Sequence, residues 1–269
     1  MNSVLQLLGV STALLLNACP ASSREMVQCL LPKNFSAASP ASRPSSPPVI
    51  VPHTAFHVPI AMYHYIRTVP KNDPRGVSLS VDPRRFDHQL DTYAAKGYQT
   101  IGFQDLANSE SVLPIKPIIL TFDDGYEDAY TEAFPRLVAH GMKGVFYIVT
   151  DFVGKPGYVT WDQLREMRNA GMEIAAHTTQ HHELSKLSPD NQEYEIKESV
   201  KILANALDIR IYSVAYPVGK YSTDTLKIMR TTGVPFAVTT HHGIATSEYH
   251  SHELPRVRVN DETDVGKRF

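Results

Sequence analysis

Thr121-Phe122-Asp123-Asp124-Gly125-Tyr126 places two adjacent carboxylates directly after an apolar run. That run, residues 117–122, is predicted to be a buried strand, so the two aspartates stand at its C-terminal end. Asp rarely remains beside an apolar interior unless a cation or a set of hydrogen bonds stabilises its charge. The pair therefore indicates an active site. The alternative is that Asp124 merely caps the helix that follows.

Apolar runs alternate with amphipathic stretches on both sides of this strand. Strands are predicted at 59–63, 99–103, 117–122, 144–149, 172–176, 211–216 and 235–239. Helices are predicted at 83–96, 127–140, 160–170, 189–207 and 222–232, and a polar loop at 70–80. Strands that alternate with helices pair in parallel through crossover connections, which predicts an α/β barrel or a related closed sheet. A doubly wound open sheet is the competing architecture.

Four chemically unusual segments stand at the ends of separate predicted strands. They are His64, the Asp123-Asp124 pair, His177 with His181, and Tyr216-Pro217-Val218-Gly219. In a parallel barrel the C-terminal strand ends lie on one face, where active sites are built from several strands. We therefore expect these distant segments to converge.

The segment His177-Thr178-Thr179-Gln180-His181 carries two imidazoles four residues apart. This spacing brings both rings close enough to share one cation. Two histidines and a carboxylate, with positions left for water and substrate, commonly form a catalytic zinc site. Cobalt, nickel and iron accept the same ligands, so zinc is the first choice among several divalent metals.

These segments resemble the motifs of the polysaccharide deacetylases with the NodB homology domain, carbohydrate esterase family 4. Thr121–Tyr126 matches the first motif of that family, and His177–His181 matches the second. Tyr216-Pro217-Val218-Gly219-Lys220-Tyr221 is similar to the third motif, which forms a groove wall. The resemblance spans about residues 59–259. It implies a deformed (β/α) barrel that removes acetyl groups from N-acetylglucosamine (GlcNAc) polymers.

The resemblance also implies the roles of individual residues. Asp123 would be the general base, and Asp124, His177 and His181 would be the metal ligands. A cation lowers the pKa of a bound water toward ~7, so that a base can take its proton and the hydroxide can attack the acetamide carbonyl. The backbone N–H of Val218 corresponds to the oxyanion donor of the family. The substrate-binding or oxyanion group as a whole comprises Tyr216, Pro217, Val218, Gly219 and Arg256.

The sequence departs from the usual family pattern in two places. Ala215 stands where the third motif commonly has arginine, and the late Leu-x-His motif that supplies the general acid is missing. An early Met62-Tyr63-His64 element is similar to that of the poly-β-1,6-GlcNAc deacetylases, a subgroup with circularly permuted motifs. This similarity implies that His64 is the general acid, with a core or substrate-facing histidine as the alternative. Arg256 is either the replacement partner of Asp123 or part of a surface salt bridge.

The N-terminal region is predicted to contain an export signal followed by a tether. Residues 1–19 include an apolar run too short to span a bilayer, and Leu16-Asn17-Ala18-Cys19 resembles a lipobox. This pattern predicts either a cleaved signal peptide or a lipoprotein signal that attaches Cys19 to a membrane. Residues 20–55 have the Pro- and Ser-rich composition of a linker, and residues 56–269 form the catalytic domain. We expect an exported protein of the periplasm or cell envelope.

Composition limits the remaining functions. The 269 residues are 42% hydrophobic and 20% charged, which is ordinary for a globular protein, and the net charge of -2 offers no electrostatic footprint for nucleic acid. The predicted function is metal-dependent N-deacetylation of a GlcNAc polysaccharide, with a biofilm exopolysaccharide of the poly-β-1,6 type favoured. Peptidoglycan, chitin oligomers and O-acetylated xylan are alternatives. A catalytically degenerate carbohydrate-binding protein of the same fold is the alternative outside enzymes.

Overall fold

The structure is a computed structural model that describes residues 53–70 and 72–269. The expected signal at 1–19, the lipidated Cys19 and most of the linker at 20–55 lie outside the described residues. Within the described part, no helix combines the length and the apolar character needed to cross a membrane.

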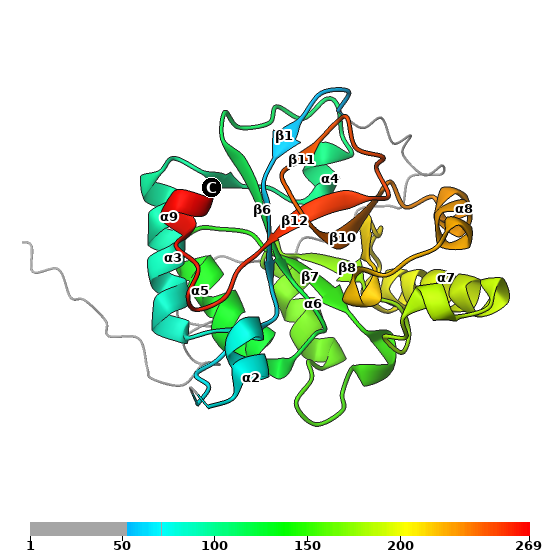
Figure 1. Cartoon of the computed structure of the whole chain (residues 1–269), viewed down its shortest axis with the longest axis horizontal. Helices are drawn as coiled ribbons and strands as arrows, with labels where there is room; N and C mark the ends of the chain where they lie inside the picture. The colour runs from blue at the N-terminus through cyan, green and yellow to red at the C-terminus, as the bar shows by residue number, and fades with distance from the viewer. Residues whose placement is uncertain (1–52, 71) are drawn as a thin grey trace, which may run out of the picture.

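Seven parallel strands form a closed barrel (Figure 1). Their bounds are β2 Ile60–Tyr63, β6 Pro117–Phe122, β7 Val145–Ile148, β8 Glu173–Ala176, β9 Ser213–Ala215, β10 Phe236–His242 and β12 Leu254–Arg258. The order around the ring is β2, β12, β10, β9, β8, β7 and β6, and the pairing of β6 with β2 closes it. β5 (Gln99–Thr100) extends β6 outside the ring. The predicted α/β barrel is confirmed, and the open sheet is wrong.

Strand residues alternate between two apolar clusters. On β7, Val145 and Tyr147 belong to one cluster, whereas Phe146 and Ile148 belong to the other. The first cluster fills the barrel, and the second packs the strands against the outer helices. Because both faces of each strand are buried, the strands appear in the sequence as continuous apolar runs instead of alternating patterns.

Helices cover the outside of the barrel. They are α3 Pro83–Ala95, α5 Phe134–Ala139, α6 Trp161–Asn169, α7 Pro189–Leu207, α8 Thr223–Thr232 and α9 Val265–Arg268. Their starts follow local capping signals, because the side chains of Asp82, Thr160, Ser188 and Ser222 each accept a hydrogen bond from the first turn of a helix. At the N-terminal end of the barrel, β1 (His57–Val58) pairs with β11 (Ala245–Thr246).

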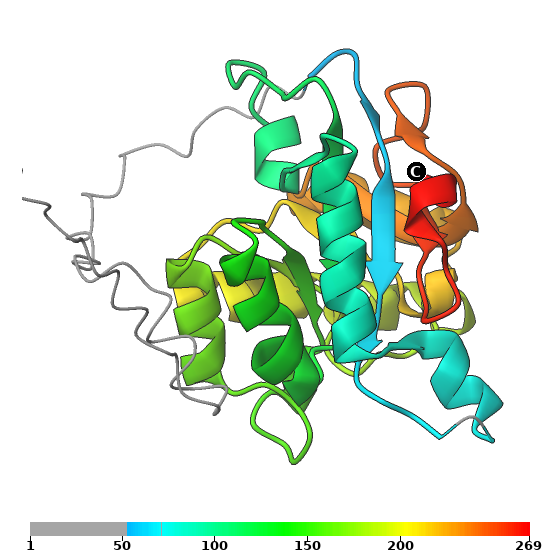
Figure 2. The same cartoon turned by 90° about the vertical axis from the view of Figure 1, so that its left-hand side faces the viewer.

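The structure corrects the predicted elements at three positions. Helix α2 (Pro74–Leu79) occupies the segment predicted to be a loop, and in Figure 2 it lies beyond the C-terminal end of β2. The short helix α4 (Phe103–Leu106) begins where the strand predicted at 99–103 was expected to end. The helix predicted at 127–140 is a π-helical turn followed by α5, in whose first turn Pro135 is tolerated because its missing N–H has no partner there.

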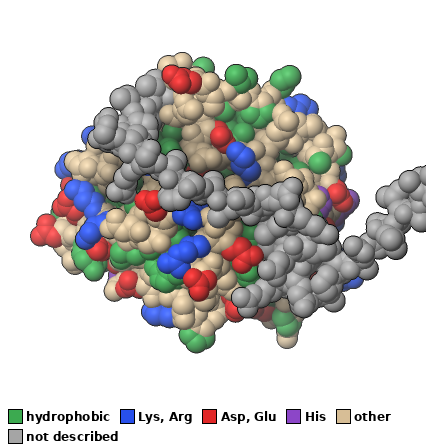
Figure 3. All heavy atoms as spheres, turned by 180° about the vertical axis from the view of Figure 1, so that it is seen from behind, with side chains coloured by type: hydrophobic (Ala, Val, Ile, Leu, Met, Phe, Trp, Pro, Cys, Tyr) green, Lys and Arg blue, Asp and Glu red, His purple; other side chains and the backbone are tan. Residues whose placement is uncertain are grey.

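Surface charge is mixed on the face opposite to the view of Figure 1. In Figure 3, acidic and basic side chains of the described residues are interspersed on this face. This pattern agrees with the small net charge of -2.

Candidate active site

The C-terminal ends of the barrel strands surround a cavity of about 470 Å³. Its lining includes five residues that the sequence placed in the site: His64, Asp123, Asp124, His177 and His181. They follow β2, β6 and β8, which are far apart in the sequence and lie in one ring. The expected convergence at one end of the barrel is therefore present.

Asp124, His177 and His181 form the group of potential metal ligands that the described residues contain. The Oδ1 atom of Asp124 lies 3.2 Å from the Nε2 atom of each histidine. Bonds of about 2.0–2.1 Å from a tetrahedral cation place its ligand atoms roughly 3.3 Å apart. The three side chains therefore fit a small divalent cation such as zinc.

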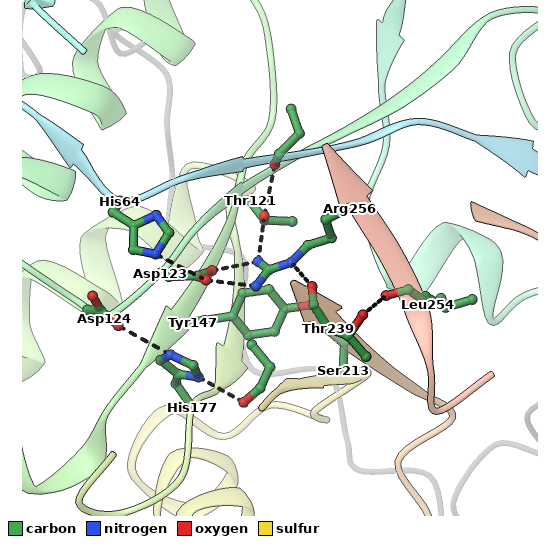
Figure 4. Close-up of polar contacts among 12 residues, drawn as sticks. His64, Thr121, Asp123, Asp124, Tyr147, His177, Ser213, Thr239, Leu254 and Arg256 are labelled. Carbon is green, nitrogen blue, oxygen red and sulfur yellow. Dashed lines mark hydrogen bonds and ion pairs between the residues drawn. The ribbon is translucent and has the colours of Figure 1, made fainter. Parts of the chain in front are cut away.

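His177 is oriented by the backbone on its far side. Its Nδ1 atom lies 2.8 Å from the carbonyl oxygen of Ala215 (Figure 4). A carbonyl oxygen only accepts, so Nδ1 carries a proton and donates it, which leaves Nε2 as the atom available to a cation. Burial lowers the pKa of His177, but Asp124 beside it outweighs burial and the pKa is raised. A proton at Nε2 competes with a metal, so metal binding is expected to weaken in acid.

Glu195 on α7 organises the loop that carries both histidines. Its Oε2 atom accepts hydrogen bonds from the backbone N–H groups of Thr179 and Gln180, both at 2.9 Å, and from the Thr179 hydroxyl at 2.7 Å. Its Oε1 atom lies 2.9 Å from Nδ1 of His182. Burial raises the pKa of Glu195, but these donors outweigh it and hold the pKa below its usual value. The sequence contains no local signal for this contact, because Glu195 lies on the next helix.

Backbone strain is concentrated around the cavity. Five described residues other than glycine have positive φ, and four of them belong to the site: Asp124 (78°), Thr178 (64°), His181 (62°) and Val218 (51°). The fifth, Asp208, caps the C-terminus of α7. Each such residue costs on the order of 1–3 kcal/mol. The surrounding contacts, including those of Glu195, must therefore hold the ligand loops in place.

Asp123 is paired with Arg256 from β12, as Figure 4 shows. Two guanidinium N–H groups donate to its carboxylate, Nη1 to Oδ1 at 2.7 Å and Nη2 to Oδ2 at 2.8 Å. Two further N–H groups of Arg256, on Nη1 and Nε, donate to the Thr121 hydroxyl and the Thr239 carbonyl oxygen. The ring of Tyr147 lies 5.7 Å from the guanidinium. The Arg256 side chain is 0% exposed, so this ion pair is not a surface salt bridge.

The pairing decides the charge of Asp123. Burial raises the pKa of its carboxyl group, but the charge of Arg256 and its hydrogen bonds outweigh burial, and the pKa lies below the usual value. Asp123 is therefore ionised and can accept a proton from a group in the cavity. Arg256 supplies from β12 the guanidinium that the third motif lacks at Ala215.

His64 lies at the edge of the same cavity. Its Nε2 atom is 3.9 Å from Oδ2 of Asp123, and its side chain is 13% exposed. Burial lowers the pKa of His64 below its usual value, and the negative charge of Asp123 opposes this only in part. Asp128 anchors the segment that follows, because its Oδ2 atom accepts a hydrogen bond from the Ile66 N–H at 3.1 Å. The position suits a proton donor, and the role of His64 as general acid stays a prediction.

The third-motif segment forms one wall of the cavity. Tyr216 and Val218 line the cavity, whereas Pro217 and Gly219 are buried behind them. A Cβ atom at Gly219 would meet Oγ1 of Thr240 at 2.1 Å, and its φ of +69° also favours glycine. Pro217 and Gly219 therefore shape the wall, and Tyr216 and Val218 are the members positioned to touch a ligand.

Further cavity residues were not predicted. Arg258 is one of them. The sequence analysis did not identify β12 as a strand, so the alternation of its side chains between the two faces could not be used to place Arg258. Arg67 is another, and it follows the short strand β3 (Tyr65–Ile66). By contrast, the alternation of Tyr63 and Tyr65 about His64 predicts that one of the two tyrosines faces the site. Tyr65 lines the cavity, and its ring stacks on that of Tyr126 with centroids 4.0 Å apart.

The C-terminal face of this parallel barrel carries an Asp-His-His group beside a buried Asp-Arg pair. This combination of fold and site is typical of hydrolases that are built on a barrel. Comparison with known proteins narrows the class. The sequence profile of the family described as polysaccharide deacetylase matches residues 111–237. The Bacillus subtilis protein YxkH, named as a polysaccharide deacetylase, is 34% identical over 206 residues, which cover 76% of this chain and 71% of YxkH. The chain belongs to the polysaccharide deacetylase family, whose members hydrolyse N-acetyl amide bonds.

Two further relatives agree with this assignment. The poly-β-1,6-N-acetyl-D-glucosamine N-deacetylase of Staphylococcus aureus is 24% identical over 204 residues, covering 69% of each chain. Among solved structures, the Streptococcus pyogenes deacetylase PplD in complex with acetate is 31% identical, with a TM-score of 0.73 over 78% of this chain and 96% of that chain. The deformed (β/α) barrel expected from the family resemblance is thus confirmed.

Proposed function

We propose that this protein is a divalent-metal-dependent N-deacetylase of a GlcNAc-containing polysaccharide. The observation that carries the proposal is the arrangement of Asp124, whose Oδ1 atom lies 3.2 Å from Nε2 of both His177 and His181. Asp123 stands beside this group as an ionised carboxylate that Arg256 holds in place. A cation site next to a fixed base is one arrangement that catalyses the hydrolysis of an unactivated amide.

Asp124, His177 and His181 would hold the cation, with zinc as the first choice and cobalt, nickel or iron as alternatives. When bound, the cation would lower the pKa of a water molecule and polarise the acetamide carbonyl. Asp123 accepts the proton of the nucleophilic water. The backbone N–H of Val218 donates to the developing oxyanion, and His64 gives a proton to the departing amine nitrogen.

The substrate proposed is an exopolysaccharide of the poly-β-1,6-GlcNAc type. The name of the Staphylococcus aureus relative and the early Met62-Tyr63-His64 element support this linkage. Peptidoglycan and chitin oligomers are the alternatives. The signal predicted at 1–19 supports a location in the bacterial envelope, with Cys19 as the predicted lipid anchor.

The test is the release of free amine from acetylated β-1,6 and β-1,4 GlcNAc oligomers by the purified chain. The chain is stripped of metal and then resupplied with zinc or cobalt. We expect metal to restore activity, and we expect Asp123→Asn and His64→Ala each to lower kcat by about 10²-fold or more. Asp162→Asn on α6, where the side chain is 96% exposed, is the matched control.

The relative rates on the two linkages identify the substrate class. Oligomer binding without turnover under every metal would contradict the enzyme proposal and favour a carbohydrate-binding protein of the same fold. Full activity of His64→Ala would leave the deacetylase function standing and remove His64 as the acid.

A further inference from the structure

Two arginines that the proposed mechanism does not use line the active-site cavity, Arg67 after β3 and Arg258 at the end of β12. In the described part of the chain, neither guanidinium donates a hydrogen bond or forms an ion pair within 4.0 Å. Arg67 stacks on Tyr65, with its guanidinium carbon 3.5 Å from the ring centroid. Asp128 is within electrostatic reach of Arg67 but accepts its hydrogen bond from the Ile66 N–H.

Arg258 differs sharply from Arg256, although the two stand on one strand. Residues two apart on a strand point to the same side, so both side chains belong to the barrel interior and its mouth. Arg256 is 0% exposed and donates hydrogen bonds to Asp123, Thr121 and Thr239. Arg258 lies one step nearer the mouth, is exposed, and keeps its donors free for a ligand.

The charges of the site balance before any cation binds. Three carboxylates and two guanidiniums line the cavity, and a third guanidinium lies directly beneath it. These groups are Asp73, Asp123, Asp124, Arg67, Arg258 and Arg256. With a divalent cation in the proposed site and neutral histidines, the cavity has an excess of positive charge. Such a site favours a ligand of negative charge.

The guanidinium group restricts the chemistry of that ligand. Its planar fork of N–H donors matches the paired oxygens of a carboxylate or a phosphate. A GlcNAc unit offers only neutral hydroxyl and amide groups. We infer that the cavity recognises an acidic GlcNAc glycan, in which a carboxylate or phosphate on or beside the acetylated sugar binds Arg258 and Arg67. This inference rests on the proposed deacetylase function and names the charge class of its substrate.

A second cavity gives room for the rest of the polymer. Its volume is about 860 Å³, and Arg67 lines both cavities and so lies at their junction. The rest of its charged lining is mixed, with Arg84, Arg85 and His88 beside Asp82, Asp261 and Glu262, so Arg67 is the basic residue that this cavity shares with the active site. A glycan that leaves the active site in this direction passes Arg67. Fully acetylated poly-β-1,6-GlcNAc is uncharged, so a substrate of that linkage must carry acidic substituents to satisfy the two arginines.

The experiment compares acidic oligomers with neutral oligomers of the same size. One arm uses GlcNAc oligomers that alternate with a sugar bearing a lactyl carboxylate, and the same oligomers as methyl esters. The other arm uses β-1,4 GlcNAc oligomers with and without one phosphate. For the metal-loaded wild type, we expect kcat/KM to be about tenfold higher on the acidic member of at least one pair. Added salt should reduce this ratio.

The variants assign the preference to residues. In Arg258→Gln the ratio should fall toward one, mainly through KM, and Arg258→Lys should retain part of it because it keeps the charge without the fork. Arg67→Gln should lower the ratio in the same direction. Arg165→Gln on α6 removes one positive charge outside both cavities and should keep the wild-type ratio.

Two results would overturn the inference. One is a wild-type ratio near one in both arms. The other is an equal loss on acidic and neutral oligomers in Arg258→Gln, which would assign this arginine to balancing the aspartates. Failure to hydrolyse any oligomer would count against the proposed function instead. Calorimetric binding of the same pairs then decides the inference, because about tenfold tighter binding of the acidic member supports it and equal binding overturns it.

Discussion

The two ends of strand β8 place polar residues in opposite surroundings. Glu173 begins the strand and His177 follows its last residue, and both share the interior-facing side with Ala175. The end that carries His177 opens into the cavity. The end that carries Glu173 is closed by α4, where the N–H of Gln104 donates to Oε2 of Glu173 at 3.0 Å.

Buried carboxylates at the two ends therefore behave differently. Asp123 is 3% exposed and Glu173 is 9% exposed, and burial raises the pKa of both. Arg256 reverses the effect for Asp123. Glu173 has no such partner, its Oε1 atom has no hydrogen-bond partner among the described residues, and its pKa is raised to about 7. The comparison shows that the partner, more than the depth of burial, decides whether a carboxylate in this barrel is charged.

Removing the partner from Asp123 should have the largest effect. Arg256→Met leaves a buried charge unpaired, and we expect it to lower the free energy of unfolding by roughly 3–5 kcal/mol, measured by urea denaturation. The double variant with Asp123→Asn removes the stranded charge and should recover part of the loss. Equal stability of the single and double variants would show that packing around Arg256 matters more than charge.

Removing the charge from Glu173 should stabilise the protein in alkali. Because its folded pKa of about 7 lies above the usual 4.5, protonation favours the folded state. This contribution is complete below pH ~4.5 and is lost as pH rises through about 7. We therefore expect the free energy of unfolding of Glu173→Gln to be about 3 kcal/mol higher than that of the wild type at pH 9, and nearly equal to it at pH 4. The control is Glu110→Gln, whose side chain is exposed.

If Glu173→Gln raises the free energy of unfolding by the same amount at pH 4 and pH 9, the titration of Glu173 is not the cause of the gain. Denaturation curves at both pH values decide the point. The exposed control should show no such pH-dependent difference, because its side chain is in contact with water in the folded chain as in the unfolded one.

In its surroundings, Glu195 is intermediate between Asp123 and Glu173. Its carboxylate has no arginine partner but is surrounded by neutral N–H and O–H donors and one histidine. Glu195→Gln keeps the shape but weakens these bonds. We expect the affinity for zinc, measured by calorimetry, to fall about tenfold, roughly 1.4 kcal/mol. Glu193→Gln on the exposed side of α7 is the matched control. Unchanged zinc affinity in Glu195→Gln would show that the loop keeps its form without a charged acceptor.

Local sequence patterns were sufficient to predict the alternation of strands and helices and the convergence of the aspartates and histidines, whereas closure of the sheet and the roles of the metal ligands came from the family resemblance. The apolar run before Asp123 and the run before His177 are continuous because both strand faces are buried. Strand β12 was not recognised, since Leu254-Pro255-Arg256-Val257-Arg258 contains a proline and two charges. Of these arginines, Arg256 pairs with Asp123 and Arg258 lines the cavity. The apolar run by which a buried strand is normally recognised is therefore missing in β12, because arginines occupy positions that apolar residues would otherwise fill.

The contacts of Glu195 and Arg67 were inaccessible for another reason. Neither contact is encoded by spacing along one helix or strand, because each depends on how separate elements pack. Glu195 reaches Thr179 across a gap of 16 residues between α7 and the loop after β8. Arg67 follows a two-residue strand, Tyr65–Ile66, that is too short to give a period. Residue type alone could not distinguish either side chain from an ordinary surface charge.

The pairing of the first barrel strand with the last has a consequence for synthesis on the ribosome. β2 and β12 are neighbours in the ring, with Ala61 opposite Val257 and Met62 opposite Arg258. While the nascent chain ends before Leu254, Asp123 has already been made but its guanidinium partner has not. The ring cannot close, and a catalytic centre cannot assemble, until almost the whole domain has emerged. Catalytic competence therefore cannot precede the arrival of the final strand.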